Sequence, residues 1–131
     1  MPLPSFHMID AAPRPVAPFS HAAEVDGWVH LTGQMPTWPA EPDRPLPDGI
    51  EAQTRRVMDN LILVLQGLDL SLRNVVQARV YITDFDRDYA AMNAVYTGYF
   101  EAGKLPARTC IGVNGLAVGA LVEIDMVARR P

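Results

Sequence analysis

Hydrophobic side chains recur at two different periods along the chain, and each change of period marks the start of a new element. Alternation of apolar and polar residues, bounded by Pro and Gly, indicates strands, whereas apolar residues three and four positions apart indicate an amphipathic helix. The pattern predicts strands over residues 6–9, 19–25, 28–32, 75–83, 107–113 and 121–128, and helices over residues 50–68 and 86–100. Asp26-Gly27 is a strong signal for a two-residue hairpin turn.

The order of these elements predicts an α+β fold. Strands, a helix, a strand, a helix and a final strand pair are typical of a sandwich in which two helices cover one face of a mixed sheet. In the strand over 75–83, alternation places Val76, Ala78, Val80 and Ile82 on one face. A chain of 131 residues predicts one domain, residues 1–131. Residues 35–49 hold five of the twelve prolines and are predicted to form a loop.

Composition narrows the class of function. The formal net charge is −4, and the basic residues form no cluster of the kind that a nucleic-acid backbone requires. The single cysteine, Cys110, can form neither an internal disulfide nor a zinc site alone. His7, His21 and His30 are too scattered to suggest a metal site. We see neither a signal peptide nor a membrane span, so we expect a cytoplasmic protein that binds neither membranes nor nucleic acid.

The last two predicted strands carry an arginine and a glutamate that could act together. If residues 107–113 and 121–128 form an antiparallel hairpin whose turn is centred between Gly115 and Leu116, Arg108 lies opposite Glu123 on the same face. Cys110 shares that face, and Val122, Ile124 and Met126 are predicted to point the other way, toward the helices. Two interpretations stay open. The pair could be a surface salt bridge, or Arg108 could grip a carboxylate while Glu123 accepts a proton from water.

Several segments, taken in order, resemble the RidA (YjgF-type) family. The segments that carry the resemblance are Ala17-Pro18-Phe19-Ser20-His21, Leu31-Thr32-Gly33-Gln34-Met35-Pro36, Gln53 through Leu61, Met92-Asn93-Ala94-Val95-Tyr96, and Pro106-Ala107-Arg108-Thr109-Cys110 with Glu123 fifteen residues after the arginine. Each motif alone is weak, but together they are specific and cover nearly the whole chain.

The resemblance implies a chorismate-mutase-like fold that forms a homotrimer with active sites between subunits. Family members hydrolyse enamines and imines of amino acids, such as 2-aminoacrylate, to 2-oxo acids and ammonia without a metal or cofactor. The resemblance gives Arg108 the task of binding the substrate carboxylate and Glu123 that of positioning or activating water. It places Cys110, Asn93 and Gly33 in the pocket wall.

Two departures from the family pattern bear on the substrate. Phe19 stands where many relatives have tyrosine, which removes a hydroxyl near the expected pocket. The 35–49 loop is also longer and richer in proline than in short members. We therefore consider a bulkier dicarboxylate such as 2-aminomuconate, with Arg44 or Arg79 meeting its second carboxylate.

Other functions stay open at this point. The chain could be a non-catalytic carboxylate-binding, chaperone-like or regulatory member of the family. Cys110 could be a nucleophile, although no histidine is obviously placed to act as its base. Asn93 could be an ordinary solvent-facing or capping polar group. We expect Tyr96, Tyr99 and Phe100 to pack in the core or at a subunit contact.

Overall fold

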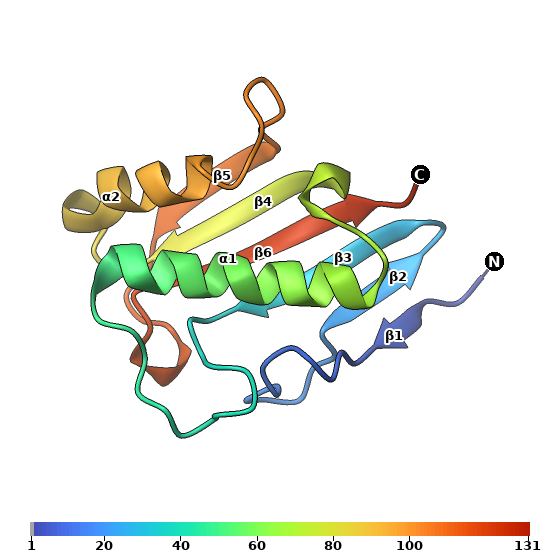
Figure 1. Cartoon of the computed structure of the whole chain (residues 1–131), viewed down its shortest axis with the longest axis horizontal. Helices are drawn as coiled ribbons and strands as arrows, with labels where there is room; N and C mark the ends of the chain where they lie inside the picture. Colours follow the sequence, from blue (N-terminus) through green and yellow to red (C-terminus); the bar gives the residue numbers. More distant parts are fainter. Residues whose placement is uncertain (1) are drawn as a thin grey trace.

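The computed structural model describes residues 2–131, which form six strands, two α-helices and two short 3-10 helices (Figure 1). The strands are β1 (Ser5–His7), β2 (Ala22–Val25), β3 (Trp28–Gln34), β4 (Val75–Ile82), β5 (Ala107–Gly112) and β6 (Val122–Arg129). The α-helices are α1 (Gly49–Gly67) and α2 (Phe85–Thr97), and the 3-10 helices are η1 (Leu72–Asn74) and η2 (Ala117–Gly119). All predicted elements are therefore present, with bounds that differ by a few residues.

The six strands form one mixed sheet in the order β1-β2-β3-β6-β4-β5. Neighbouring strands are antiparallel except β4 and β5, which run parallel. The prediction that the last two strands pair as a hairpin is wrong, because β4 lies between them and β5 is an edge strand. The nine residues from 113 to 121 thus connect β5 to β6 across the end of β4. They replace the tight hairpin turn that was predicted between these two strands.

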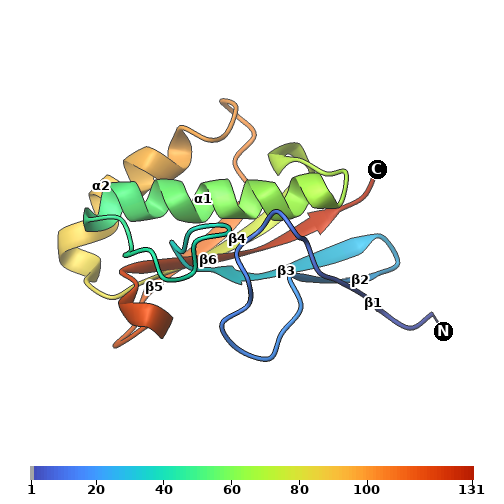
Figure 2. The ribbon, with the colours of Figure 1, turned by 60° about the horizontal axis from the view of Figure 1, so that its bottom comes forward.

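Both α-helices lie on the same side of the sheet (Figure 2). The core fills the space between them and the sheet, and its strand residues alternate with residues of the opposite face. In β6 the buried residues are Val122, Ile124, Met126 and Ala128, as the alternation predicted for the first three. The other face, which we call the bare face, is covered by neither α1 nor α2.

One residue of β4 departs from the predicted alternation. Val76 is 42% exposed, whereas Val75 is buried. The pairing of β4 with β6 shifts register between Val75 and Gln77, so a bulge moves Val76 out of the ladder. Ala78, Val80 and Ile82 are completely buried, as expected.

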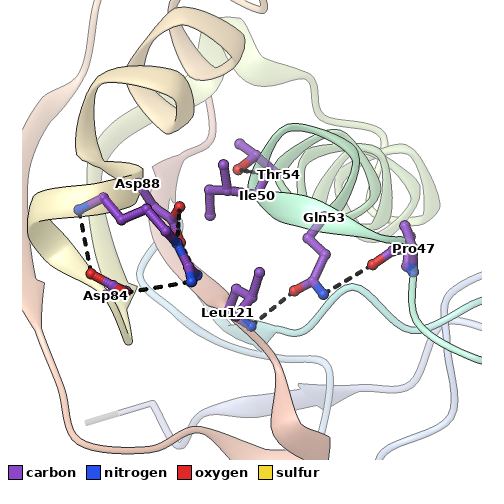
Figure 3. Close-up of polar contacts among 8 residues, drawn as sticks. Pro47, Ile50, Gln53, Thr54, Asp84, Asp88 and Leu121 are labelled. Atoms are coloured by element: carbon purple, nitrogen blue, oxygen red, sulfur yellow. Dashed lines mark hydrogen bonds and ion pairs between the residues drawn. The ribbon is translucent and has the colours of Figure 1, made fainter.

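A buried glutamine joins α1 to the start of β6. Gln53 Nε2 donates to the carbonyl of Pro47 at 3.0 Å, and Gln53 Oε1 accepts from the backbone N–H of Leu121 at 2.8 Å (Figure 3). These bonds satisfy a side chain that is only 5% exposed. They also hold the backbone two residues before Glu123.

The hairpin between β2 and β3 has the turn that its sequence predicts. Asp26 and Gly27 both have positive φ angles, 52° and 79°. Aspartate and glycine tolerate this region better than other residues, which is why this dipeptide favours a two-residue turn. The turn sets the register that places Gly33 further along β3 beside β6.

Candidate active site

Arg108 and Glu123 lie on opposite faces of the sheet. Arg108 pairs with Ala78 of β4, which in turn pairs with Met126, and both partners face the helices. Glu123 pairs with Tyr81, on the bare face. The predicted shared face is therefore wrong, because an intervening strand replaces the hairpin on which that register depended. One copy of the chain cannot bring these two side chains together.

Arg108 lies half-buried beneath α2. Its guanidinium carbon is 4.9 Å from the ring centroid of Tyr96, and its Nη1 is 4.0 Å from the sulfur of Met92. A guanidinium over an aromatic face is a favourable cation–π arrangement. Within residues 2–131 this arginine forms no ion pair. Its donor groups are thus available to an anion that reaches the helix side of β5.

Two buried polar atoms of α2, the helix that covers this arginine, have no hydrogen-bond partner within the described residues. They are Asn93 Oδ1 and the Tyr96 hydroxyl. Asn93 follows Met92 and precedes Tyr96 by three positions, and both of those neighbours contact Arg108. Buried polar groups without partners are rare because each one costs folding free energy. One explanation for such a group is that a bound ligand supplies the missing partner.

Cys110 lies two residues after Arg108 and points to the same side, where it packs partly buried against the core. Burial raises the pKa of its thiol, and the charge of Arg108 opposes this with a smaller lowering effect. A thiol whose pKa is raised is a poor nucleophile at neutral pH. This favours a role in the pocket wall. We call Arg108, Cys110, Asn93 and Tyr96 the arginine half-site.

Glu123 lies half-buried on the bare face against Gly33 of β3. A Cβ atom at position 33 would collide with the Glu123 carboxylate, so the absence of a side chain there makes room for it. The pairing of β3 with β6 shifts register between Leu31 and Gln34, and Gly33 lies within this irregular stretch. The predicted site residues Gly33 and Glu123 are therefore brought together.

The environment of Glu123 favours its protonated form. Burial raises the pKa of its carboxyl, and the nearby charge of Asp125 raises it further. Asp125 itself accepts from Arg79 Nε at 2.9 Å and from the Tyr81 hydroxyl at 3.1 Å. A carboxyl with a raised pKa is a stronger base than an ordinary one, so it accepts a proton from water more readily. We call Glu123, Gly33, Asp125 and Tyr81 the glutamate half-site.

The segment that carries Phe19 is tied to the strand that carries Gly33. The Thr32 hydroxyl donates to the carbonyl of Ser20 at 2.6 Å, and the Thr32 N–H donates to the carbonyl of His21 at 3.0 Å. Phe19 is half-buried. Its side chain offers no hydroxyl, so any proton transfer on this side of the sheet depends on other groups.

The two arginines considered for a second carboxylate have different surroundings. Arg44 lies in the long loop, where its guanidinium carbon is 3.7 Å from the centroid of the Trp38 ring and its Nη1 is 3.0 Å from Glu41 Oε2. Arg79 is on the bare face beside the glutamate half-site, bound to Asp125. Only Arg79 shares a face with Glu123.

Sequence reasoning missed three residues of these half-sites. Tyr96 was assigned to packing, and neither Asp125 nor Tyr81 was assigned a role. Alternation along β6 would have placed Asp125 on the face of Glu123, because it lies two residues later. The place of Tyr81 depends on the pairing of β4 with β6, which the local pattern does not reveal.

The described residues also bear on two other classes of site, metal centres and membrane-spanning helices. Among residues 2–131, no three His, Cys, Asp or Glu side chains are grouped so that they could hold a metal ion. Over the same residues, neither helix combines the length and apolar character that crossing a membrane requires.

Comparison with known proteins places the chain in a family. The family described as Endoribonuclease L-PSP matches residues 9–130. A RutC family protein of Pyrococcus abyssi is 36% identical over 121 residues, which cover 92% of this chain and 93% of the relative. The chain belongs to the RidA (YjgF-type) family. Protein DfrA of Myxococcus xanthus, 40% identical over 121 residues, covers 91% of this chain and 90% of its own length.

Solved structures of RidA-family proteins have the same fold. The Rid-family protein YyfA of Yersinia pestis superposes with a TM-score of 0.91 and 31% identity, over 98% of this chain and 100% of the other. The TdcF protein of E. coli, solved with bound serine, has a TM-score of 0.87 and 26% identity, over 95% of this chain and 99% of the other. The fold of two helices on a six-stranded mixed sheet is thus the chorismate-mutase-like fold of this family.

Proposed function

We propose that this RidA-family protein hydrolyses an enamine or imine of a carboxylic acid to the 2-oxo acid and ammonia. The observation that carries the proposal is the arginine half-site, in which a half-buried guanidinium without an ion-pair partner in residues 2–131 lies beneath a helix with two unpartnered buried polar atoms. Such a site suits a small carboxylate that also carries hydrogen-bond donors. The bound serine in the TdcF structure is a molecule of this class.

In the proposed complex, Arg108 holds the substrate carboxylate through two parallel hydrogen bonds. Asn93 Oδ1 accepts a hydrogen bond from the substrate nitrogen, and the Tyr96 hydroxyl supplies a further donor. These contacts fix the orientation of the reacting carbon. Positioning of this kind accounts for much of the rate enhancement when the substrate is already electrophilic.

Glu123 then carries the proton transfers. An enamine takes a proton at carbon and gives one up from nitrogen, which makes it an imine, and water then attacks the imine carbon. The Glu123 carboxylate accepts a proton from that water as the new C–O bond forms. The protonated carboxyl returns this proton to nitrogen, which gives the carbinolamine. The carboxylate then moves the proton of the new hydroxyl to nitrogen as well, so the carbonyl forms, the C–N bond breaks and ammonia leaves. A carboxyl with a raised pKa suits both steps.

Because the half-sites face opposite sides of the sheet, the proposal requires two copies of the chain. One copy contributes Arg108 and its neighbour contributes Glu123. The bare face offers a surface for such contact, since it exposes Trp28 and Ile111, which are 43% and 46% accessible. We infer a homotrimer from the family resemblance, and a solution mass three times the 14.4 kDa of the chain would support it.

The test measures ammonia release from freshly generated 2-iminopropanoate. Arg108→Lys keeps the charge but loses the paired geometry, and we expect kcat/KM to fall roughly a hundredfold. Arg55→Lys, an exposed position on α1, serves as the matched control and should behave as the unaltered protein. Unchanged turnover in Arg108→Lys would contradict the proposed role. Carboxylate binding without any turnover by the unaltered protein would favour the non-catalytic alternative.

The size of the substrate is a separate question. A dicarboxylate such as 2-aminomuconate would need a second cation, and Arg79 is the candidate on the face of Glu123, once it releases Asp125. Comparing kcat/KM for 2-aminomuconate and 2-iminopropanoate decides between the two substrates, since a strong preference for the smaller compound would exclude the dicarboxylate.

An RNA-cleavage assay on the same preparation tests the activity in the family's description. We expect none, given the formal charge of −4.

A further inference from the structure

A cavity of about 620 Å³ lies between the C-terminal ends of α1 and α2, and none of the residues that line it belongs to either half-site. Residues of α1, η1, the first residue of β4 and the segment after α2 line it. The lining residues are Ile62, Gln66, Ser71, Leu72, Arg73, Val75, Tyr99, Phe100, Glu101 and Lys104. Its volume is within the range of small-molecule sites in proteins.

The wall of the cavity is largely apolar and is not covered by the chain itself. Ile62, Leu72, Tyr99 and Phe100 are each only half-buried, although all are large apolar or aromatic residues. Tyr99 is held in place because its hydroxyl donates to Asp59 Oδ1 at 2.9 Å. Half-exposed apolar side chains around a hollow favour a ligand with an apolar body, because binding would remove their surface from water.

The rim carries an excess of positive charge at one end. Arg73 Nε donates to Glu101 Oε1 at 2.8 Å, and Lys104 Nζ lies 3.0 Å from Glu101 Oε2. These two cations, first Lys104 and then Arg73, hold the pKa of Glu101 below its usual range. Two cations share one carboxylate, so one positive charge is left uncompensated among these three groups. A ligand anion would be attracted to this end.

A pair of aromatic rings separates the cavity from the arginine half-site. Phe100 lines the cavity, and its ring centroid is 4.9 Å from that of Tyr96. Tyr96 in turn faces Arg108. Arg108, Asn93, Tyr96 and Cys110 do not line the cavity, so its walls can be altered without replacing a proposed catalytic residue.

We propose that this cavity is a second ligand site, specific for a small monocarboxylate with an aromatic or branched apolar body. The apolar body packs between Leu72, Tyr99 and Phe100. The carboxylate lies at the rim, where Arg73 and Lys104 donate to it.

Indole-3-acetate is a suitable probe, with indole-3-acetamide as its neutral counterpart of nearly the same shape. Backbone amide shifts in NMR spectra of the full chain locate binding and give the Kd. We expect saturable shifts in residues 71–75 and 99–104, with the acid binding roughly tenfold or more tightly than the amide. Shifts confined to other regions, or equal affinity for acid and amide, would overturn the proposal.

Three variants separate the contributions. Arg73→Gln with Lys104→Gln should abolish the preference for the acid, whereas Leu72→Trp should fill the cavity and weaken both probes. Arg55→Gln removes a charge near Tyr99 from a position outside the lining, and it should leave both affinities unchanged. A preference that survives in the double variant would refute the role of the rim. Deaminase turnover without probe should persist in Leu72→Trp, which separates this test from that of the proposed function.

Discussion

The opposite orientation of Arg108 and Glu123 leads to a quantitative prediction about mixed oligomers. Arg108→Ala and Glu123→Ala should each be inactive as pure proteins, because every site lacks one of its two groups. Mixing them should restore activity. In the proposed homotrimer, which is a closed ring, each site would take Arg108 from one subunit and Glu123 from the next. With equal amounts and random exchange, about a quarter of all sites combine an intact arginine with an intact glutamate.

This fraction of restored sites follows because the two groups of a site come from different subunits. It does not depend on the number of subunits in the ring. A site needs an intact Arg108 on one side, with a chance of about one half, and an intact Glu123 on the other, again about one half. If one chain supplied both groups, no mixture of the two variants could contain a complete site. The structure excludes that arrangement, because the two residues pair with neighbours on opposite faces.

The assay is ammonia release from 2-iminopropanoate after the two variants are unfolded together and refolded. A control mixes the unaltered protein with the double variant Arg108→Ala/Glu123→Ala. Its activity should fall from about a half to about a quarter of the unaltered value as subunits exchange. Exchange itself is checked by mass spectrometry with a tag on one variant. If exchange is complete and the single-variant mixture stays inactive, the two-copy site is refuted.

Three further predictions concern individual residues of the half-sites. Gly33→Ala should leave the melting temperature almost unchanged but lower kcat/KM roughly a hundredfold, because the new Cβ displaces the Glu123 carboxylate; full activity would contradict this. Glu123→Gln should raise the melting temperature at neutral pH, because the pKa of Glu123 is raised by burial and then by Asp125, so the folded chain disfavours the charged form. That gain should vanish below the ordinary glutamate pKa of 4.5, where both side chains are neutral, and a pH series of thermal unfolding checks it. Cys110→Ser should keep most of the turnover, and Cys110 should react slowly with iodoacetamide at neutral pH, because burial raises the pKa of the thiol; rapid alkylation with loss of activity would revive the nucleophile hypothesis.

The periodicity of the sequence was sufficient to find the six strands and both α-helices, but neither the two short 3-10 helices nor the partners of the strands. Alternation reports which residues of one strand share a face, and it correctly set Val122, Ile124 and Met126 toward the helices. It carries no information on which strand lies alongside. Consecutive strands are usually neighbours, so a hairpin was the natural expectation for β5 and β6. The insertion of β4 between them is a long-range feature.

For the candidate site too, the sequence predicted individual residues but not which of them lie together. The resemblance named Arg108, Glu123, Gly33, Cys110 and Asn93, and the structure groups them into two separate clusters. Which residues accompany each cluster depends on helix packing and on cross-strand neighbours. Tyr96 shows this most directly, because a helical aromatic reads as core until its unpartnered hydroxyl is seen.

The position of β6 in the sheet has a consequence for the order in which the chain can fold. β6 lies between β3 and β4, yet it is the last strand in the sequence. During synthesis, β1 to β3 and β4 with β5 therefore have no shared neighbour until residues 122–129 emerge from the ribosome. Contacts between segments far apart in sequence also slow folding. We expect nascent chains that stop before β6 to expose the inner face of both halves and to depend on chaperones until the final strand is made.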